Sequence, residues 1–294
     1  MGRHAYLIMA HNQPEVLIRL LQLIDDLRND IYLHLDTKFT IDENVFRDKV
    51  NYSNIYLAPR MDVHWGGFSL VRCSFSLFKM AEETENYDFY HLLSGVDLPL
   101  KSQNELHDFF DLHLGEQFVS FDDECLEVNW HRVKYRWLLQ EKKGYKNKNV
   151  YNFIDKLLIA GQKIFKMDFR NKQVNYKLGS NWASLSADFV KYLVSHENEI
   201  VGLFKNTAAT DEMYIQTLLY NSPYASSCYH DMENISENLR YTDFEKGSAS
   251  PRIINGKDIH MLMNSKYLFA RKFDYDKEPK AVELLYNSLI EQEK

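Results

Sequence analysis

The 294-residue sequence lacks any apolar run near the roughly 20 residues that a membrane-spanning helix needs. The apolar core of a secretory signal peptide is not seen at its start either, because Met-Gly-Arg-His leads directly into a strand-like segment. Cysteine is scarce, and Cys73, Cys125 and Cys228 form neither a Cys-x-x-Cys pair nor a Cys/His cluster with zinc spacing. We therefore expect a soluble cytoplasmic protein whose cysteines are reduced and structural.

An excess of positive charge is also missing. The chain has 35 Lys and Arg against 42 Asp and Glu, which gives a formal net charge of -7. Because nucleic-acid binding needs a basic surface, nucleic acid is excluded as the main partner. Hydrophobic residues make up 45% of the chain, enough for one large core or two smaller ones.

The common phosphate-binding and nucleophile motifs do not occur. Neither Gly-x-Gly-x-x-Gly nor a P-loop is present, and the absence of Gly-x-Ser-x-Gly disfavours an α/β-hydrolase. Asp122-Asp123-Glu124 lacks the Asp-x-Asp spacing of metal-dependent nucleotide-sugar transferases, and Asp36 in HLDTK stands alone. A bound diphosphate would then be neutralised by cations of the protein, so we expect neither a metal nor a cofactor.

Apolar runs alternate with helical periods along the chain. Strand-like segments are expected at 5–11, 30–36, 54–59, 88–95 and 178–186, and helices at 15–27, 68–81, 187–194 and 210–219. This order predicts an α/β fold with a mainly parallel central sheet flanked by helices. Ligands of such sheets bind at the carboxyl ends of the strands. The polar residues expected at that edge are His11, Asn12, Asp36, 64–67 and 94–97.

One basic segment interrupts this pattern. Residues 142–177 contain ten Lys or Arg and two acidic residues. The apolar residues on one face of its predicted helix are Val150, Phe153, Ile154, Leu157, Leu158, Ile164 and Phe165. Two interpretations stay open: a solvated helical excursion packed on the domain, or a basic amphipathic helix on an anionic membrane surface. Since no repeat or linker divides the chain, we expect one domain over 1–294 with an insertion at 142–177.

The stretch TDEMYIQTLL places two carboxylates, Asp211 and Glu212, before an amphipathic helix. With Thr210 as the N-cap, both would interact favourably with the helix dipole, by roughly 0.3–1 kcal/mol each. The alternative is that one of them is a general base. The residues alone leave both interpretations open, because acidic first turns are common.

Five ordered motifs together resemble a known family. They are HWGGFSLVRC (64–73), HLLSGVDLPLKS (91–102), GSNWASLS (179–186), TDEMYIQTLL (210–219) and LFARKFD (268–274). The chain resembles the core-2/I-branching β-1,6-N-acetylglucosaminyltransferase and peptide xylosyltransferase family from about residue 5 to residue 274. The resemblance implies a GT-A-like fold and an inverting, metal-independent mechanism. Without an N-terminal anchor and with few cysteines, the chain looks like a bacterial-type cytoplasmic member.

The resemblance also implies roles for individual residues. In the Asp-Glu pair of the family motif, the Glu is the general base and corresponds to Glu212. Asp211 is expected only to interact favourably with the helix dipole. The cations that hold the donor diphosphate correspond to Arg252 in SPRIING and Lys272 in ARKFD. Arg271, beside Lys272, is either an alternative phosphate ligand or an ordinary surface charge, and the surface charge is the preferred interpretation.

The remaining binding residues follow from the same resemblance. The nucleoside would lie against Met9, Ala10, His11 and Asp36. Residues expected to line the donor site are Trp65, Gly66 and Asp97; the glycines after Trp65 would let the backbone approach a ligand closely, and a plain tight turn is the alternative interpretation of that loop. The acceptor would be held by Asp123, Trp182, Tyr241 and Asp243, although Tyr-Thr-Asp stands here in place of the Trp-x-Tyr of animal relatives.

The function implied is the transfer of a sugar from a UDP-sugar to a hydroxyl of a glycan or lipid-linked glycan, in polysaccharide biosynthesis. β-Linked GlcNAc is the favoured sugar, and UDP-xylose, UDP-glucose and UDP-galactose are alternative donors. A non-catalytic carbohydrate-binding protein is the alternative of another class. The basic segment adds a peripheral contact with the inner face of the cell membrane as an expectation.

Overall fold

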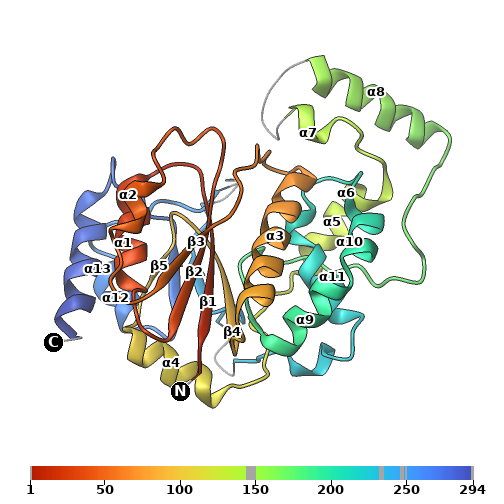
Figure 1. Ribbon diagram of the computed structural model, residues 1–294. Helices are drawn as coiled ribbons and strands as arrows, with labels where there is room; N and C mark the ends of the chain where they lie inside the picture. Colours follow the sequence, from red (N-terminus) through yellow and green to blue (C-terminus); the bar gives the residue numbers. More distant parts are fainter. Residues whose placement is uncertain (1, 144–149, 232–234, 246–247, 249, 293–294) are drawn as a thin grey trace.

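The computed structural model describes residues 2–143, 150–231, 235–245, 248 and 250–292 (Figure 1). Its central sheet has the strand order β3-β2-β1-β4-β6. The strands are β1 (His4–Ala10), β2 (Asn29–Leu35), β3 (Asn54–Leu57), β4 (Phe89–Ser94) and β6 (Ser184–Ser186). β1, β2, β3 and β4 pair in parallel, whereas β6 joins β4 antiparallel. The prediction of an α/β fold with a mainly parallel sheet is confirmed.

A second, smaller sheet has the order β5-β8-β7. Its strands are β5 (Leu98–Pro99), β7 (Arg240–Thr242) and β8 (Phe269–Arg271). β7 and β8 are parallel, and β5 is antiparallel to β8. Since β5 directly follows the loop after β4, this sheet places the end of β8 beside the end of β4.

Some of the described helices cover the two faces of the central sheet, and others lie away from it. They are α1 (Pro14–Leu23), α2 (Asn44–Arg47), α3 (Phe68–Thr84), α4 (Gln103–Leu112), α5 (Asp123–Asn129), α6 (His131–Lys134), α7 (Gln140–Lys143), α8 (Val150–Ile164), α9 (Ala187–Ser195), α10 (Glu197–Phe204), α11 (Tyr214–Tyr220), α12 (Ile259–Met263) and α13 (Pro279–Gln292). Two 3-10 turns are η1 (Thr210–Glu212) and η2 (Ala225–Ser227). Figure 1 shows α1, α12 and α13 on one side of the sheet and α3, α9 and α11 on the other.

β1 shows why the sheet has a hydrophobic core on each side. Its even-numbered residues from Tyr6 to Ala10 pack with α1 and α13. Its odd-numbered residues from Ala5 to Met9 pack with α3, α9 and α11. Successive side chains of a strand point to opposite faces, so a continuous apolar run indicates burial on both.

Three buried histidines lie between the central sheet and α4. The rings of His4 and His107 stack with centroids 4.0 Å apart, and His4 Nδ1 lies 3.1 Å from His91 Nε2. Burial lowers the pKa of His4 and His91 well below the usual value and lowers the pKa of His107 to about 4. The buried guanidinium of Arg240 acts in the same direction on His91. We call His4, His91 and His107 the histidine cluster.

Two predicted elements are shorter in the structure. The helix expected at 15–27 ends at Leu23. The strand expected at 178–186 forms only at Ser184–Ser186, because Gly179 packs against another loop rather than against a strand. All three cysteines are free, as predicted.

The basic segment contains α8 and a return segment after it, while 144–149 lie outside the described residues. The predicted helix is present, but its apolar face is exposed to solvent. Ile159, on the opposite face, is buried. No helix in the described part of the chain is long and apolar enough to cross a membrane.

Candidate active site

The candidate site lies at the carboxyl ends of β1 and β4. Here the Gly95 N–H donates to the Met9 carbonyl (3.0 Å), and the Asp36 N–H donates to the Ala10 carbonyl (2.9 Å). Gly95 has to be glycine, because a Cβ would lie 2.7 Å from the Cβ of Ala10. The loops after β1, β2 and β4 therefore meet at one edge, as the sheet topology predicts.

The turn that carries Glu212 is fixed by backbone contacts with two other motifs. The Glu212 carbonyl accepts from the Gly179 N–H (2.9 Å), and the Ala209 N–H donates to the Gly66 carbonyl (2.8 Å). A Cβ on Gly179 would lie 1.8 Å from the Ser120 carbonyl oxygen, so no other residue fits there. The fold thus brings 64–67, 179–186 and 210–219 together.

The helix predicted at 210–219 is divided into η1 and α11. The N-cap of η1 is Ala209, with φ of 48°, and neither element has a side-chain cap. The buried hydroxyl of Thr210 makes no hydrogen bond with the described residues. The interpretation of Thr210 as N-cap, with Asp211 and Glu212 in the first turn of the helix, is therefore wrong.

Glu212 is half-exposed and held by one arginine. Its Oε2 accepts from Arg132 Nη1 at 2.6 Å, with side-chain exposures of 44% for Glu212 and 13% for Arg132. Arg132 also donates from Nε to Asn129 Oδ1 (3.1 Å). No hydrogen bond from the described residues reaches Glu212 Oε1. The carboxylate is therefore oriented by one oxygen and open on the other.

Asp211 has a different environment. Its side chain is buried, and burial followed by the charge of Glu212 raises the pKa of Asp211 to about 7. The two adjacent carboxyl groups thus have different environments: Asp211 is buried with a raised pKa, and Glu212 is paired with a cation. Neighbouring carboxyl groups in distinct environments are typical of acid-base sites.

A second ion pair lies beside the first. Asp97 is buried and accepts from the Ser94 N–H (2.8 Å) and hydroxyl (2.6 Å), while Arg271 Nε lies 3.4 Å from Asp97 Oδ1. The Arg271 guanidinium is 4.5 Å from the ring centroid of Trp182, a cation-π distance. Burial lowers the pKa of Arg271, and Asp97 and Glu212 act to raise it. The side chain is 18% exposed, so the interpretation of Arg271 as a surface charge is wrong.

The two cations predicted to hold a diphosphate follow β7 and β8. Lys272 Nζ donates to Ser250 Oγ at 2.8 Å. Arg252 donates to Asp243 (2.5 Å) and Asp258 (2.7 Å), so two carboxylates already balance its charge. Lys272 is next to Arg271 in sequence, and its contact with Ser250 draws the SPRIING segment toward the end of β8.

The four acceptor candidates are not gathered at one point. Trp182 lies at the second ion pair. Asp123, at the start of α5, accepts two hydrogen bonds from Lys177 Nζ at 2.8 and 2.9 Å. Tyr241 lies in β7 and Asp243 directly follows it, with the Tyr241 hydroxyl 3.5 Å from the Asp243 carboxylate. Of these four candidates, Trp182 lies beside the ion pairs, through its contact with Arg271.

The nucleoside candidates occupy the ends of β1 and β2. They are Met9 and Ala10, both buried, His11, which is exposed, and Asp36, which is buried. Asp36 accepts from the backbone N–H groups of Lys38 (2.8 Å) and Val63 (3.0 Å). It therefore organises the loop after β3 as well as standing at the site edge.

The 64–67 loop closes the site edge before α3. The Trp65 side chain is 45% exposed, and Gly66 has φ of 77°, which favours glycine. Glu141 of α7 accepts from the Ser69 N–H at 2.7 Å, in the first turn of α3. The insertion is therefore attached to the fold next to this loop.

One Asp-x-Asp motif follows β8 and was missed above. Gln13 donates from Nε2 to Asp274 Oδ1 (3.2 Å) and Asp276 Oδ2 (2.9 Å). Across the described residues, no group of three or more His, Cys, Asp or Glu side chains is arranged to hold a metal ion.

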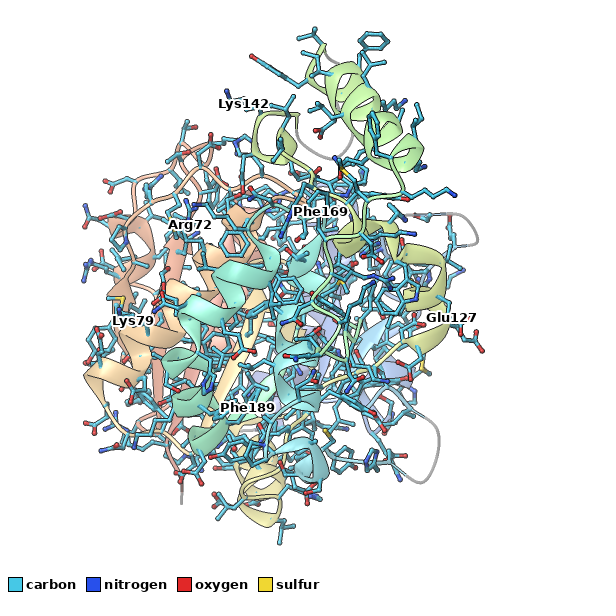
Figure 2. The ribbon with its side chains drawn as sticks, turned by 90° about the vertical axis from the view of Figure 1, so that its right-hand side faces the viewer. Arg72, Lys79, Glu127, Lys142, Phe169 and Phe189 are labelled. Atoms are coloured by element: carbon cyan, nitrogen blue, oxygen red, sulfur yellow. The ribbon has the colours of Figure 1, made fainter. Side chains whose placement is uncertain are left out.

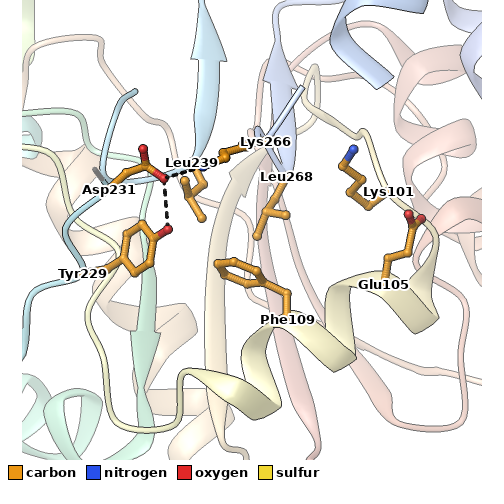
Figure 3. Close-up of a pocket in the computed structure, with 8 residues that line it drawn as sticks. All are labelled: Lys101, Glu105, Phe109, Tyr229, Asp231, Leu239, Lys266 and Leu268. Carbon is orange, nitrogen blue, oxygen red and sulfur yellow. Dashed lines mark hydrogen bonds and ion pairs between the residues drawn. The ribbon is translucent and has the colours of Figure 1, made fainter. Parts of the chain in front are cut away.

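A separate pocket of about 340 Å³ lies at the starts of β7 and β8 (Figure 3). Arg271 is at the other end of β8. The pocket is lined by Lys101, Glu105, Phe109, Tyr229, Asp231, Leu239, Lys266 and Leu268. Two of its charged side chains make hydrogen bonds within the fold. Lys101 donates to the Met263 carbonyl (2.6 Å), and Asp231 accepts from the Tyr229 hydroxyl (3.3 Å).

Sequence reasoning missed Arg132 and misplaced Arg271. Arg132 lies in NWHRVKYR, a stretch that carries no recognised motif and contacts Glu212 across 80 positions. Arg271 follows buried Phe269 and Ala270 at the end of β8, and its burial comes from tertiary contacts with Asp97 and Trp182.

The model of the family described as Core-2/I-Branching enzyme matches residues 4–264. The chain is 24% identical over 321 residues to xylosyltransferase 2 of Rattus norvegicus, with 96% of this chain and 33% of that protein covered. It is 25% identical over 312 residues to the β-1,3-galactosyl-O-glycosyl-glycoprotein β-1,6-N-acetylglucosaminyltransferase of Homo sapiens, with 96% and 68% covered. The chain thus spans about a third of the length of the xylosyltransferases it matches.

Two solved structures also show a likeness. Glycosyltransferase GlyE of Streptococcus pneumoniae has a TM-score of 0.43 at 11% identity, over 99% of this chain and 64% of that chain. S. aureus TarS 1-349 in complex with UDP-GlcNAc has a TM-score of 0.28 at 14% identity, over 40% and 33%. At these scores neither likeness carries an argument about the chemistry of this chain.

Proposed function

The chain belongs to the core-2/I-branching enzyme family, and on this premise we propose that it is a glycosyltransferase that uses a UDP-sugar donor. The acceptor is a hydroxyl group of a glycan or lipid-linked glycan in polysaccharide biosynthesis. The mechanism is inverting and metal-independent, and the favoured product carries β-linked GlcNAc.

The observation that carries this proposal is the state of Glu212. A general base has to reach the acceptor hydroxyl with a free oxygen, in a fixed orientation. Glu212 meets both conditions, because Arg132 holds Oε2 at 2.6 Å while the half-exposed carboxylate keeps Oε1 open. The two backbone hydrogen bonds at η1 fix the position of the main chain below it.

In the proposed reaction the acceptor oxygen attacks the anomeric carbon as the bond to UDP breaks on the opposite side. The acceptor proton passes to Glu212 Oε1. The leaving diphosphate gains charge, and the cations Lys272 and Arg271 at the end of β8 stabilise it. Arg252 can also bind the diphosphate once its hydrogen bonds with Asp243 and Asp258 are broken.

The donor sugar is a finer proposal. Relatives at equal identity are named for xylose and for GlcNAc transfer. UDP-GlcNAc is placed first on the resemblance of the motifs, and UDP-xylose, UDP-glucose and UDP-galactose are the competing donors. A non-catalytic carbohydrate-binding protein is the second candidate function, favoured by the two carboxylates that balance the charge of Arg252.

Glu212→Gln tests the proposal. Transfer of sugar from the UDP-sugar to a glycan panel should fall by roughly 10²–10⁴, while binding of UDP should be retained. Glu127→Gln, at an exposed position of α5, is the matched control and should act like the wild type. A Glu212→Gln variant with wild-type transfer would overturn the role of Glu212, and a wild type without turnover would favour the binding protein.

Thermal unfolding with a panel of UDP-sugars, in EDTA and in Mn²⁺, identifies the donor without a known acceptor. A ligand at 100 times its Kd stabilises the folded state by about 2.7 kcal/mol. A shift in thermal unfolding that is also seen in EDTA would support binding of the diphosphate by cations of the protein rather than by a metal ion. A shift that requires Mn²⁺ would refute metal independence and direct attention to Asp274 and Asp276.

A further inference from the structure

Helix α8 presents its apolar face to solvent. Its exposed apolar residues are Val150, Tyr151, Phe153, Ile154, Leu157, Leu158 and Ile164, followed by Phe165, Met167 and Phe169. Several of these are more than half exposed, among them Phe153 at 63% and Ile164 at 76%. The spacing of three and four residues places those from Val150 to Ile164 on one side of the helix. We call these seven residues of the helix the α8 apolar face.

The opposite side of α8 is already attached to the protein. Ile159 is buried, and Asp155 Oδ1 lies 3.3 Å from the Leu139 N–H that donates to it. Gln162 exchanges hydrogen bonds with the backbone of Arg136 at 2.8 and 3.0 Å. The orientation of the helix is therefore fixed by its polar contacts, with the apolar face turned outward. Figure 2 shows α8 projecting from the body of the molecule beyond α7, where Lys142 is labelled.

Exposed lysines border the α8 apolar face. Lys156 and Lys163 are exposed, are seven residues apart and lie on one flank, between the α8 apolar face and the buried side of the helix; the Lys163 ammonium is 5.9 Å from the ring centroid of Tyr135, and Lys166 follows the end of the helix. The segment 142–177 has ten basic and two acidic residues, although the whole chain has a net charge of -7. An anionic surface would therefore attract this segment and repel the rest of the protein, which orients the molecule with α8 toward that surface.

We propose that α8 docks this protein on an anionic lipid surface, with the α8 apolar face in the interface and its lysines at the lipid headgroups. Exposed aromatic and aliphatic residues on one face with lysines beside them are the features of helices that lie in a membrane interface. Lysine stems pack along the apolar boundary while the ammonium groups reach the headgroups.

A second copy of the chain fits the same face less well. In a symmetric contact between two α8 helices, Lys156, Lys163 and Lys166 of both copies would approach one another. Like charges at an interface oppose association, whereas anionic headgroups neutralise the same lysines. The charge pattern therefore favours lipid.

Docking would place the candidate site near the surface. α7, which precedes α8, is bonded through Glu141 to the Ser69 N–H of α3 at 2.7 Å, next to the 64–67 loop. Arg132, the partner of Glu212, lies in α6, in the chain segment just before α7. The proposal needs no particular chemistry at the site, but it fits an acceptor carried on a lipid.

Flotation with liposomes tests this inference. The wild type should float with vesicles of phosphatidylcholine containing phosphatidylglycerol and stay behind with phosphatidylcholine alone, and salt should reduce the recovery. Leu157→Asn should weaken binding on the order of tenfold, since a half-exposed leucine is removed from the interface. Replacing Lys156, Lys163 and Lys166 by Gln should weaken binding roughly fivefold for each lysine.

Leu112→Asn is the control, because Leu112 is also an exposed helical leucine, at 83% against 57% for Leu157, but lies on α4, away from α8. It should float like the wild type, and all variants should keep the wild-type thermal unfolding. Equal recovery with neutral and anionic vesicles would overturn the proposal. A stable dimer that Leu157→Asn dissociates, without flotation of the wild type, would overturn it in favour of a second copy. Glu212→Gln should float normally, so failure of the glycosyltransferase proposal would be distinguishable.

Discussion

Acidification should unfold this protein through the histidine cluster. His4, His91 and His107 have a folded-state pKa below the ordinary value of 6.5, because burial disfavours their charged forms. The unfolded chain therefore binds more protons than the folded chain below about pH 6.5. Stability is present in full above that pH and is lost as the pH falls toward 4, the folded-state pKa of His107.

The size of the effect follows from proton counts. Each proton bound by the unfolded chain alone changes the free energy of unfolding by about 1.4 kcal/mol per pH unit. The histidine cluster can therefore contribute about 4 kcal/mol per unit between pH 6 and 4.5. Asp211 opposes it by about 1.4 kcal/mol per unit, because its raised pKa makes the folded chain hold an extra proton in this range. Together the histidine cluster and Asp211 contribute a slope of about 3 kcal/mol per unit.

Urea unfolding followed by circular dichroism at pH 7, 6, 5.5, 5 and 4.5 measures this slope. His107→Gln should reduce it by about 1.4 kcal/mol per unit. Glutamine can still donate to Asn29, which His107 contacts at 2.9 Å. His260→Gln, at an exposed position of α12, should leave the slope unchanged. A slope that is the same in wild type and His107→Gln would refute the reasoning.

Two more predictions concern the site. Arg271→Met should lower stability by about 3 kcal/mol, because it leaves buried Asp97 without its cation, and should reduce the thermal shift with UDP. Arg271→Lys should recover part of both but not the contact with Trp182. Wild-type stability of Arg271→Met in thermal unfolding would contradict the ion pair. Asp211→Asn should stabilise the protein at pH 8 by up to about 4 kcal/mol and hardly at all at pH 4, since the folded-state pKa near 7 penalises the charged form above it. An equal effect at both pH values in urea unfolding would contradict burial next to Glu212.

The sequence was sufficient for the strand-helix alternation because periodicity records burial directly. β1 and β4 are apolar on both faces and were recognised as strands of a parallel sheet. Short elements were harder. β6 has three residues and is held by pairing with β4, which local pattern does not encode.

The candidate site was only partly predictable for the same reason. Glu212, Asp97 and Trp182 stand in motifs, so the resemblance marked them. Arg132 contacts Glu212 through tertiary structure, and the sequence around it carries no sign of that contact. The burial of Arg271 depends on how β8 pairs with its neighbours in the sheet, and local composition does not reveal that pairing.

The position of Glu212 depends on main-chain atoms and on two glycines, Gly66 and Gly179, rather than on the side chains that surround the substrate. Such an arrangement separates the reaction from its specificity. Trp182 or Tyr241 can be exchanged during evolution or by engineering while the carboxylate keeps its place. Under the proposed role of Glu212 as general base, selection for a new acceptor could act on the surrounding side chains without first rebuilding the η1 turn.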